Sequence, residues 1–198
     1  MSMRRVGPGD ARHLVRRFTV ALTASPPSAA DEAWALSWLS DAERLLWSSQ
    51  ATRDRRHTVA VARAVLADVP AATAVGADAD PDREAACRAL TEWVVPAALL
   101  HDVGKAEAPL GVTGRVVATV VELLGGGRLG PRLAERDGRI GTFGRYLDYP
   151  ARGACTLERA GSHPLVSAWA REHHLPPYRR TVPDPWASRL AAADDTAV

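Results

Sequence analysis

A short apolar run that ends in a histidine and an aspartate constrains this chain more than any other feature of its sequence. The residues from Val94 to Leu100 are all apolar, and His101 and Asp102 follow directly. An imidazole and a carboxylate at the mouth of a buried helix are costly to desolvate unless another group pairs with them. A divalent metal ion is such a partner, because neutral imidazole nitrogen and carboxylate oxygen are both good metal ligands. Gly104 then predicts the end of the helix, as a C-terminal glycine does.

The residue after that glycine adds a second observation. Lys105 is the only lysine among the 25 basic residues, and every other one is arginine. A compact ammonium suits a site that contacts a phosphate oxygen, which favours a functional lysine. Chance and a solvated surface charge form the alternative interpretation.

Length and composition limit the class of protein. The chain has 198 residues, of which 46% are hydrophobic and 24% charged, so we expect one domain with a real core and a modest appendage. A net charge of +2 gives no reason to expect nucleic-acid binding. Cys87 and Cys155 are isolated thiols, typical of a reducing compartment, and no apolar run approaches the length of a membrane span. We therefore expect a cytoplasmic protein.

Apolar residues recur at helical spacing along the chain, and no convincing pair of alternating strands is present, so the sequence predicts an all-α fold. Ser40 and Glu43 form the pattern of a capping box. The run from Val116 to Leu124 is almost wholly apolar and is expected to be a buried helix. We predict three parts: a basic arm at 1–28, a helical extension at 29–50 and the main helical bundle at 51–198.

The basic arm has two interpretations. Arg12, Arg16 and Arg17 would line one side of a helix, opposite apolar residues. Such a stripe could lie on an anionic membrane surface or on a partner. A solvated charged face or a frayed arm is the favoured interpretation.

Two ligands do not hold a catalytic metal, so the metal hypothesis requires more of them. A histidine upstream and an aspartate downstream, each on its own helix, would complete the set. His57 lies near the start of a predicted helix with inward-facing valines, and Asp194 lies near the end of the last one. His163, before Pro164, is predicted to be a loop and capping residue, and His13 is not expected to be a ligand.

The order histidine, histidine-aspartate, aspartate resembles the HD-domain superfamily, over roughly residues 53 to 195. The resemblance implies an HD-like helical bundle and metal-dependent phosphohydrolysis, mostly of nucleotides; spacing alone does not show either. It assigns His57, His101, Asp102 and Asp194 as ligands of a divalent cation. Oxygen and nitrogen ligands without thiolate are compatible with manganese, iron, magnesium or zinc.

A second segment resembles members that bind more than one metal, including the HD-GYP branch. Those members carry His-Pro-x-x-Gly followed by His-His; this chain has Tyr149-Pro150, Gly153 and then His173-His174. Tyr149 replaces the first histidine, and the Gly-Tyr-Pro string is missing. These differences argue against cyclic-dinucleotide hydrolysis and favour one metal. Because adjacent helical residues point in different directions, at most one of His173 and His174 is expected to face the metal directly, and the other would lie behind the ligands, at a second metal or on substrate. Alternatively, both occupy a polar helix end.

The predicted mechanism follows from these residues. A bound cation lowers the pKa of water and polarises the phosphorus. Asp102 would accept the proton of that water, and Lys105, helped by Arg56 or Arg152, would offset charge on the phosphoryl oxygens. The run Arg53, Arg55, Arg56 is equally well interpreted as a solvated charge run.

Two functions from different classes fit the sequence. One is a hydrolase of small phosphate esters, which the presence of all four ligands and Lys105 favours. The other is a non-catalytic signalling or interaction module that keeps the helical scaffold and binds a metal or nucleotide. Three features favour the module: the basic arm, the tryptophan-rich helices before residue 50, and the loss of several residues that would bind a second metal.

Overall fold

The computed structural model describes residues 26–68, 85, 87–123 and 129–197, which form helices and no strand, so the predicted all-α fold is confirmed. The elements are α2 (Ala29–Ser37), α3 (Asp41–Ser49), α4 (Thr52–Asp68), the π-helix η1 (Leu90–Val94), α6 (Val95–Leu100), the 3-10 helix η2 (Val103–Glu107), α7 (Val112–Leu123), α8 (Gly130–Ala134), α9 (Gly138–Leu147), α10 (Tyr149–Arg159), α11 (Pro164–Glu172), the 3-10 helix η4 (Pro177–Arg179) and α12 (Trp186–Thr196). Most of the basic arm, residues 69–84 and the three glycines at 125–127 lie outside the described residues.

The first two described helices begin at serine caps. The side chain of Ser28 accepts a hydrogen bond from the Asp31 backbone N–H at the start of α2. At the start of α3, Ser40 and Glu43 form the predicted capping box, each side chain bonding to the other's backbone N–H. Both helices bury residues in the main core, including Ala35 and Trp47. The segment at 29–50 therefore packs on the same core as the bundle.

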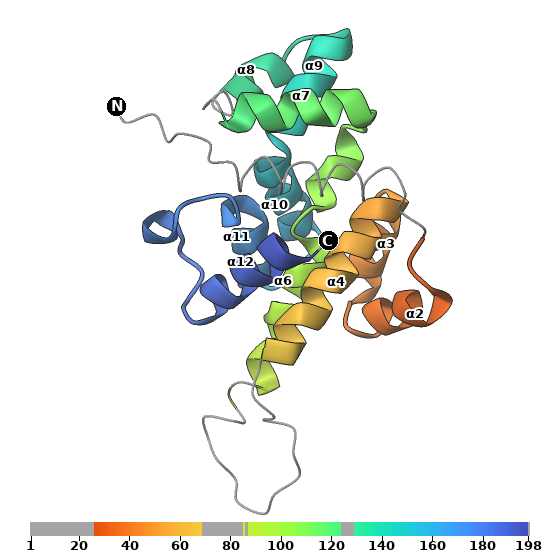
Figure 1. Ribbon diagram of the computed structural model, residues 1–198, viewed down its shortest axis with the longest axis vertical. Coiled ribbons are helices and arrows are strands. Elements are labelled where there is room, and N and C mark those ends of the chain that lie inside the picture. Colours follow the sequence, from red (N-terminus) through yellow and green to blue (C-terminus); the bar gives the residue numbers. More distant parts are fainter. Residues whose placement is uncertain (1–25, 69–84, 86, 124–128, 198) are drawn as a thin grey trace, which may run out of the picture.

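The centre of the molecule is the short helix α6, which Figure 1 shows between α4 and the pair α11 and α12. All six residues of α6 are buried. A π-helical turn, η1, runs directly into it, and Pro96 stands in the first turn of α6. His101 and Asp102 directly follow α6 and are buried among the surrounding helices.

Gly104 corrects one expectation. It does not end a helix in a left-handed conformation, because it lies inside η2 and is not among the glycines with positive φ. A Cβ atom at this position would overlap the backbone carbonyl oxygen of Tyr149 and lie 2.8 Å from the Gly153 nitrogen. Gly104 is therefore needed for the close approach of η2 to α10, not for a turn.

The helices α7, α8 and α9 form what we call the terminal lobe, which Figure 1 shows at one end of the molecule. The expectation that the apolar run in α7 is buried is wrong for three of its residues. Val116, Val117 and Val120 are exposed, at 41%, 48% and 47% of their surface. Hydrophobicity alone predicts a helix here, but whether another element covers each face depends on tertiary packing.

The last helices complete the bundle. α11 begins at His163, whose Nδ1 accepts a hydrogen bond from the Leu165 backbone N–H, as expected of a capping residue. α12 then packs against α4 and brings the C-terminal segment back to the centre, near the label C in Figure 1. Across the residues that the structure describes, no helix is both long and apolar enough to cross a membrane.

Candidate metal centre

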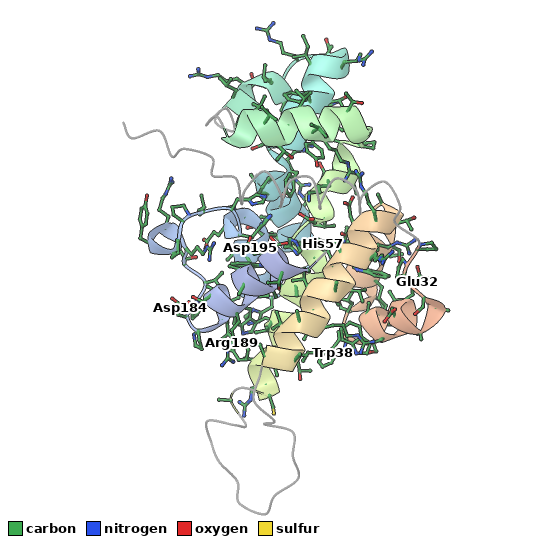
Figure 2. The ribbon with its side chains drawn as sticks, viewed as in Figure 1. Glu32, Trp38, His57, Asp184, Arg189 and Asp195 are labelled. Atoms are coloured by element: carbon green, nitrogen blue, oxygen red, sulfur yellow. The ribbon has the colours of Figure 1, made fainter. Side chains whose placement is uncertain are left out.

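The packing of α12 on α4 joins two of the predicted ligands. Nε2 of His57, on α4, lies 2.8 Å from Oδ1 of Asp194, on α12. Figure 2 labels His57 and Asp195, the neighbour of Asp194, side by side where these helices meet. The two side chains are 137 residues apart in the chain, so only the fold brings them together.

His101 approaches the same point from the end of α6. Its Nδ1 lies 2.9 Å from the backbone carbonyl oxygen of Ala98, which can only accept, so Nδ1 carries the proton. In the neutral ring Nε2 therefore carries the lone pair, and it lies 3.7 Å from both Asp102 Oδ2 and Asp194 Oδ1. The ligand atoms of His57, His101 and Asp194 all lie within 4.8 Å of one another.

Asp102 is buried beside this group and is paired with a lysine. Nζ of Lys105 lies 2.5 Å from Asp102 Oδ2, one turn along η2. Burial alone would raise the pKa of Asp102, but Lys105 and the surrounding imidazoles outweigh it and hold this pKa well below its usual range. Burial would likewise lower the pKa of Lys105, yet Asp102 raises it above the ordinary value. The pair is therefore a carboxylate and an ammonium.

Asp194 is also ionised. Burial opposes its charge, but the hydrogen bond from His57 and the nearby imidazoles lower its pKa. In the absence of a cation, a proton on His57 Nε2 lies between that nitrogen and Asp194. His101 Nε2 lies 3.7 Å from an oxygen of each carboxylate, Asp102 and Asp194.

These observations test whether the residues fit a divalent cation. Two imidazole nitrogens and one carboxylate oxygen converge from three helices, and a second carboxylate adjoins them. The hydrogen bond from His101 to a backbone carbonyl is the arrangement that fixes the ring of a metal-binding histidine. The donor set therefore fits manganese, iron, magnesium or zinc.

The predicted pair His173 and His174 forms a separate group with Tyr149. The Tyr149 hydroxyl lies 2.9 Å from His173 Nε2 and 2.6 Å from His174 Nε2. Burial lowers the pKa of His173 well below the usual value, so this ring is neutral. His173 Nε2 is 3.9 Å from Asp102 Oδ1, whereas His174 keeps an exposed surface. Sequence reasoning identified Tyr149 only as a replaced histidine and did not predict that it joins both rings.

The predicted arginines lie at different places. Arg56 is exposed on α4, one residue before His57. Arg152 binds Glu107, with 2.6 Å between its Nη2 and Oε2, on the part of α10 that faces η2. A contact of either arginine with a substrate phosphate stays a prediction, and Arg152 would have to leave Glu107 to make it.

A buried ion pair beside the centre was missed by sequence reasoning. Asp54, on α4, accepts hydrogen bonds of 2.9 and 3.1 Å from Arg115, on α7. An aspartate one turn before His57 was visible in the sequence, but its partner lies 61 residues away. The pair connects the terminal lobe to the helix that carries His57.

Comparisons with protein-family models, with curated proteins and with solved structures found no match. The function of this protein is therefore inferred from the geometry of these side chains.

Proposed function

We propose that this protein is a metal-dependent phosphohydrolase of the HD-domain type that acts on a nucleotide or a similar phosphate ester. The observation that carries the proposal is the convergence of His57, His101 and Asp194, whose ligand atoms lie within 4.8 Å of one another. Three separate helices, α4, α6 and α12, supply these atoms. Two imidazole nitrogens and a carboxylate oxygen that meet in this way are typical ligands of a divalent metal ion.

His57, His101 and Asp194 would hold the cation, with Asp102 adjoining His101. The bound cation supplies Lewis acidity toward a phosphate oxygen. The side chains around it have their own roles. His101 keeps its Nε2 lone pair directed inward, because Ala98 accepts the proton of its other nitrogen.

Asp102 and Lys105 are the catalytic residues of this proposal. The low pKa of Asp102 makes it a carboxylate, which can accept a proton from an attacking water. The ammonium of Lys105 offers positive charge for the phosphoryl oxygens. Because Lys105 already contacts Asp102, binding a phosphate requires the ammonium to turn from one anion to the other.

The test combines metal analysis with a phosphatase screen in manganese, using Asp194→Asn and a matched control. Asp195→Asn changes the exposed neighbour on the same helix and should leave metal content and turnover unchanged. Asp194→Asn should lose the metal and lower kcat/KM by roughly 100-fold or more, since even indirect partners of a metal are worth 10- to 100-fold. Equal metal content in the two variants would overturn the assigned centre.

The second candidate, a non-catalytic module on the same scaffold, has one supporting observation. Lys105 and Asp102 neutralise each other at 2.5 Å, which is a stable arrangement without any substrate. A wild-type protein that binds manganese but hydrolyses no phosphate ester would favour this module.

A further inference from the structure

The three side chains of Tyr149, His173 and His174 form a hydrogen-bonded chain next to the metal centre. The ring of His173 is 5.1 Å from that of His101, measured between centroids. Tyr149 is buried and its hydroxyl contacts both Nε2 atoms. A hydroxyl has one proton and two lone pairs, so it donates to one histidine and accepts from the other.

The direction of this chain follows from the backbone of α11. Nδ1 of His173 lies 3.0 Å from the Ala170 carbonyl oxygen, which can only accept. Nδ1 therefore carries the proton of the neutral ring, and Nε2 carries the lone pair. Tyr149 donates its proton to this Nε2, and its oxygen accepts the proton on Nε2 of His174.

We infer that Tyr149 restricts the centre to a single cation, because its hydroxyl occupies the only lone pair of His173. This inference rests on the proposed metal-dependent function. His173 Nε2 and Asp102 Oδ1 are 3.9 Å apart, close enough for both to contact a second cation. An imidazole nitrogen that accepts a phenol proton cannot at the same time bind a metal.

The surroundings keep Tyr149 in this position. Its carbonyl oxygen lies against Gly104, where no side chain separates the two backbones. The Lys105 ammonium lies 4.8 Å from the centre of its ring, a favourable cation–π contact. The hydroxyl is therefore held between the two histidines and does not need to leave for a cation to bind at His57, His101 and Asp194.

The first experiment counts manganese ions on the full-length protein by elemental analysis and calorimetry at pH 8. The wild type should bind one ion per chain. Tyr149→His replaces the phenol by an imidazole beside His173, His174 and Asp102, and this variant should bind two. Adding His173→Ala to Tyr149→His is the matched control, and it should return the count to one.

The second experiment reads the histidine protons directly in the metal-free protein, by nitrogen-15 NMR of the imidazoles. His173 should show its proton on Nδ1, and His174 should show its proton on Nε2. Tyr149→Phe keeps the ring and removes the oxygen, so His174 should lose its preference and become a mixture of tautomers. This readout remains available if Tyr149→His does not fold.

The outcomes separate this inference from the proposed function. Two ions on the wild type, one of them lost in His173→Ala, would overturn the inference and leave the hydrolase proposal intact. A proton on Nε2 of His173 in the neutral wild-type protein would also overturn it. A wild type that binds no manganese would overturn both.

Discussion

The main body and the terminal lobe of this protein are built differently. The main body buries large side chains in one continuous cluster, among them Trp47, Leu99 and Trp169, each at 1% exposure or less. The lobe has a small cluster, in which Ala118, Tyr146 and Leu147 pack with Ala108 at the end of η2. Three valines of α7 meanwhile face outward.

The candidate metal ligands belong to the more deeply packed of these two regions. Every candidate metal ligand stands on α4, α12 or the end of α6, all of which contribute to the large cluster. Gln50 also donates a hydrogen bond to the Leu99 carbonyl oxygen, which ties the end of α3 to α6. The lobe touches the centre through the ion pair of Arg115 with Asp54 and through Tyr146, whose ring centroid lies 5.9 Å from that of Tyr149. The candidate ligands thus stand on the main body, and the lobe contacts residues around them.

The largest effect should come from emptying the core of the main body. Trp169→Ala removes a fully buried indole and should cost about 4 kcal/mol of unfolding free energy. Phe143→Ala, in the lobe, removes a ring that is only partly buried and should cost about 2 kcal/mol. Urea unfolding measures both. Equal losses would contradict the comparison.

Metal should stabilise the main body selectively. Manganese at 100-fold excess over its Kd should add about 2.7 kcal/mol to the unfolding free energy, because it binds only the folded state. Hydrogen exchange should slow in α4, α6 and α12 more than in α8 and α9. Asp194→Asn should show neither effect, and uniform slowing in all helices would mean that the two regions respond as one unit.

The link between the two regions should have an intermediate effect. Arg115→Met removes the closer of the two guanidinium partners of Asp54 and leaves it only Arg53, whose Nε is 3.6 Å away. The change should cost about 2 kcal/mol, since the side chains of Arg115 and Asp54 are nearly buried, at 15% and 10% exposure. Arg132→Met, at an exposed position of α8, is the control and should change little. The double variant Asp54→Asn with Arg115→Met should cost less than the sum of the single changes. Strict additivity would show that the pair contributes no coupling.

The smallest effect should appear on the outer face of the lobe. Val117→Thr places a hydroxyl on a residue that is 48% exposed, and the unfolding free energy should change by no more than about 0.5 kcal/mol. Val65→Thr makes the same change in the main body, where the residue is fully buried, and should cost about 2 kcal/mol. Thermal unfolding of the two variants compares the two regions with the same valine-to-threonine substitution in each. A large loss in Val117→Thr would indicate that something covers this face.

Local signals in the sequence were sufficient for part of this structure. The capping box at Ser40 and the helical character of α4 and α7 depend on residues within a few positions of each other. His57, His101, Asp102 and Asp194 were predicted to share one cation; the structure brings together the ligand atoms of His57, His101 and Asp194, whereas Asp102 lies beside them, paired with Lys105. That prediction came from the order of these residues and the family resemblance it carries, not from local spacing.

Contacts between distant helices were not predictable in the same way. The meeting of Tyr149 with His173 and His174 depends on how α10 packs against α11. The exposure of Val117 depends on the absence of a covering helix among the described residues, which an apolar pattern does not encode. Arg115 and Asp54 likewise meet only because α7 folds back on α4.

Gly104 and Gly153 put two backbones in direct contact between Asp102 and Tyr149. A methyl group at either position would push η2 and α10 apart. The distance between the Asp102 carboxylate and the Tyr149 phenol therefore depends on the lack of a side chain at both glycines. Substitution of either glycine is therefore restricted during evolution. Any larger residue would shift Tyr149 relative to the cation-binding groups.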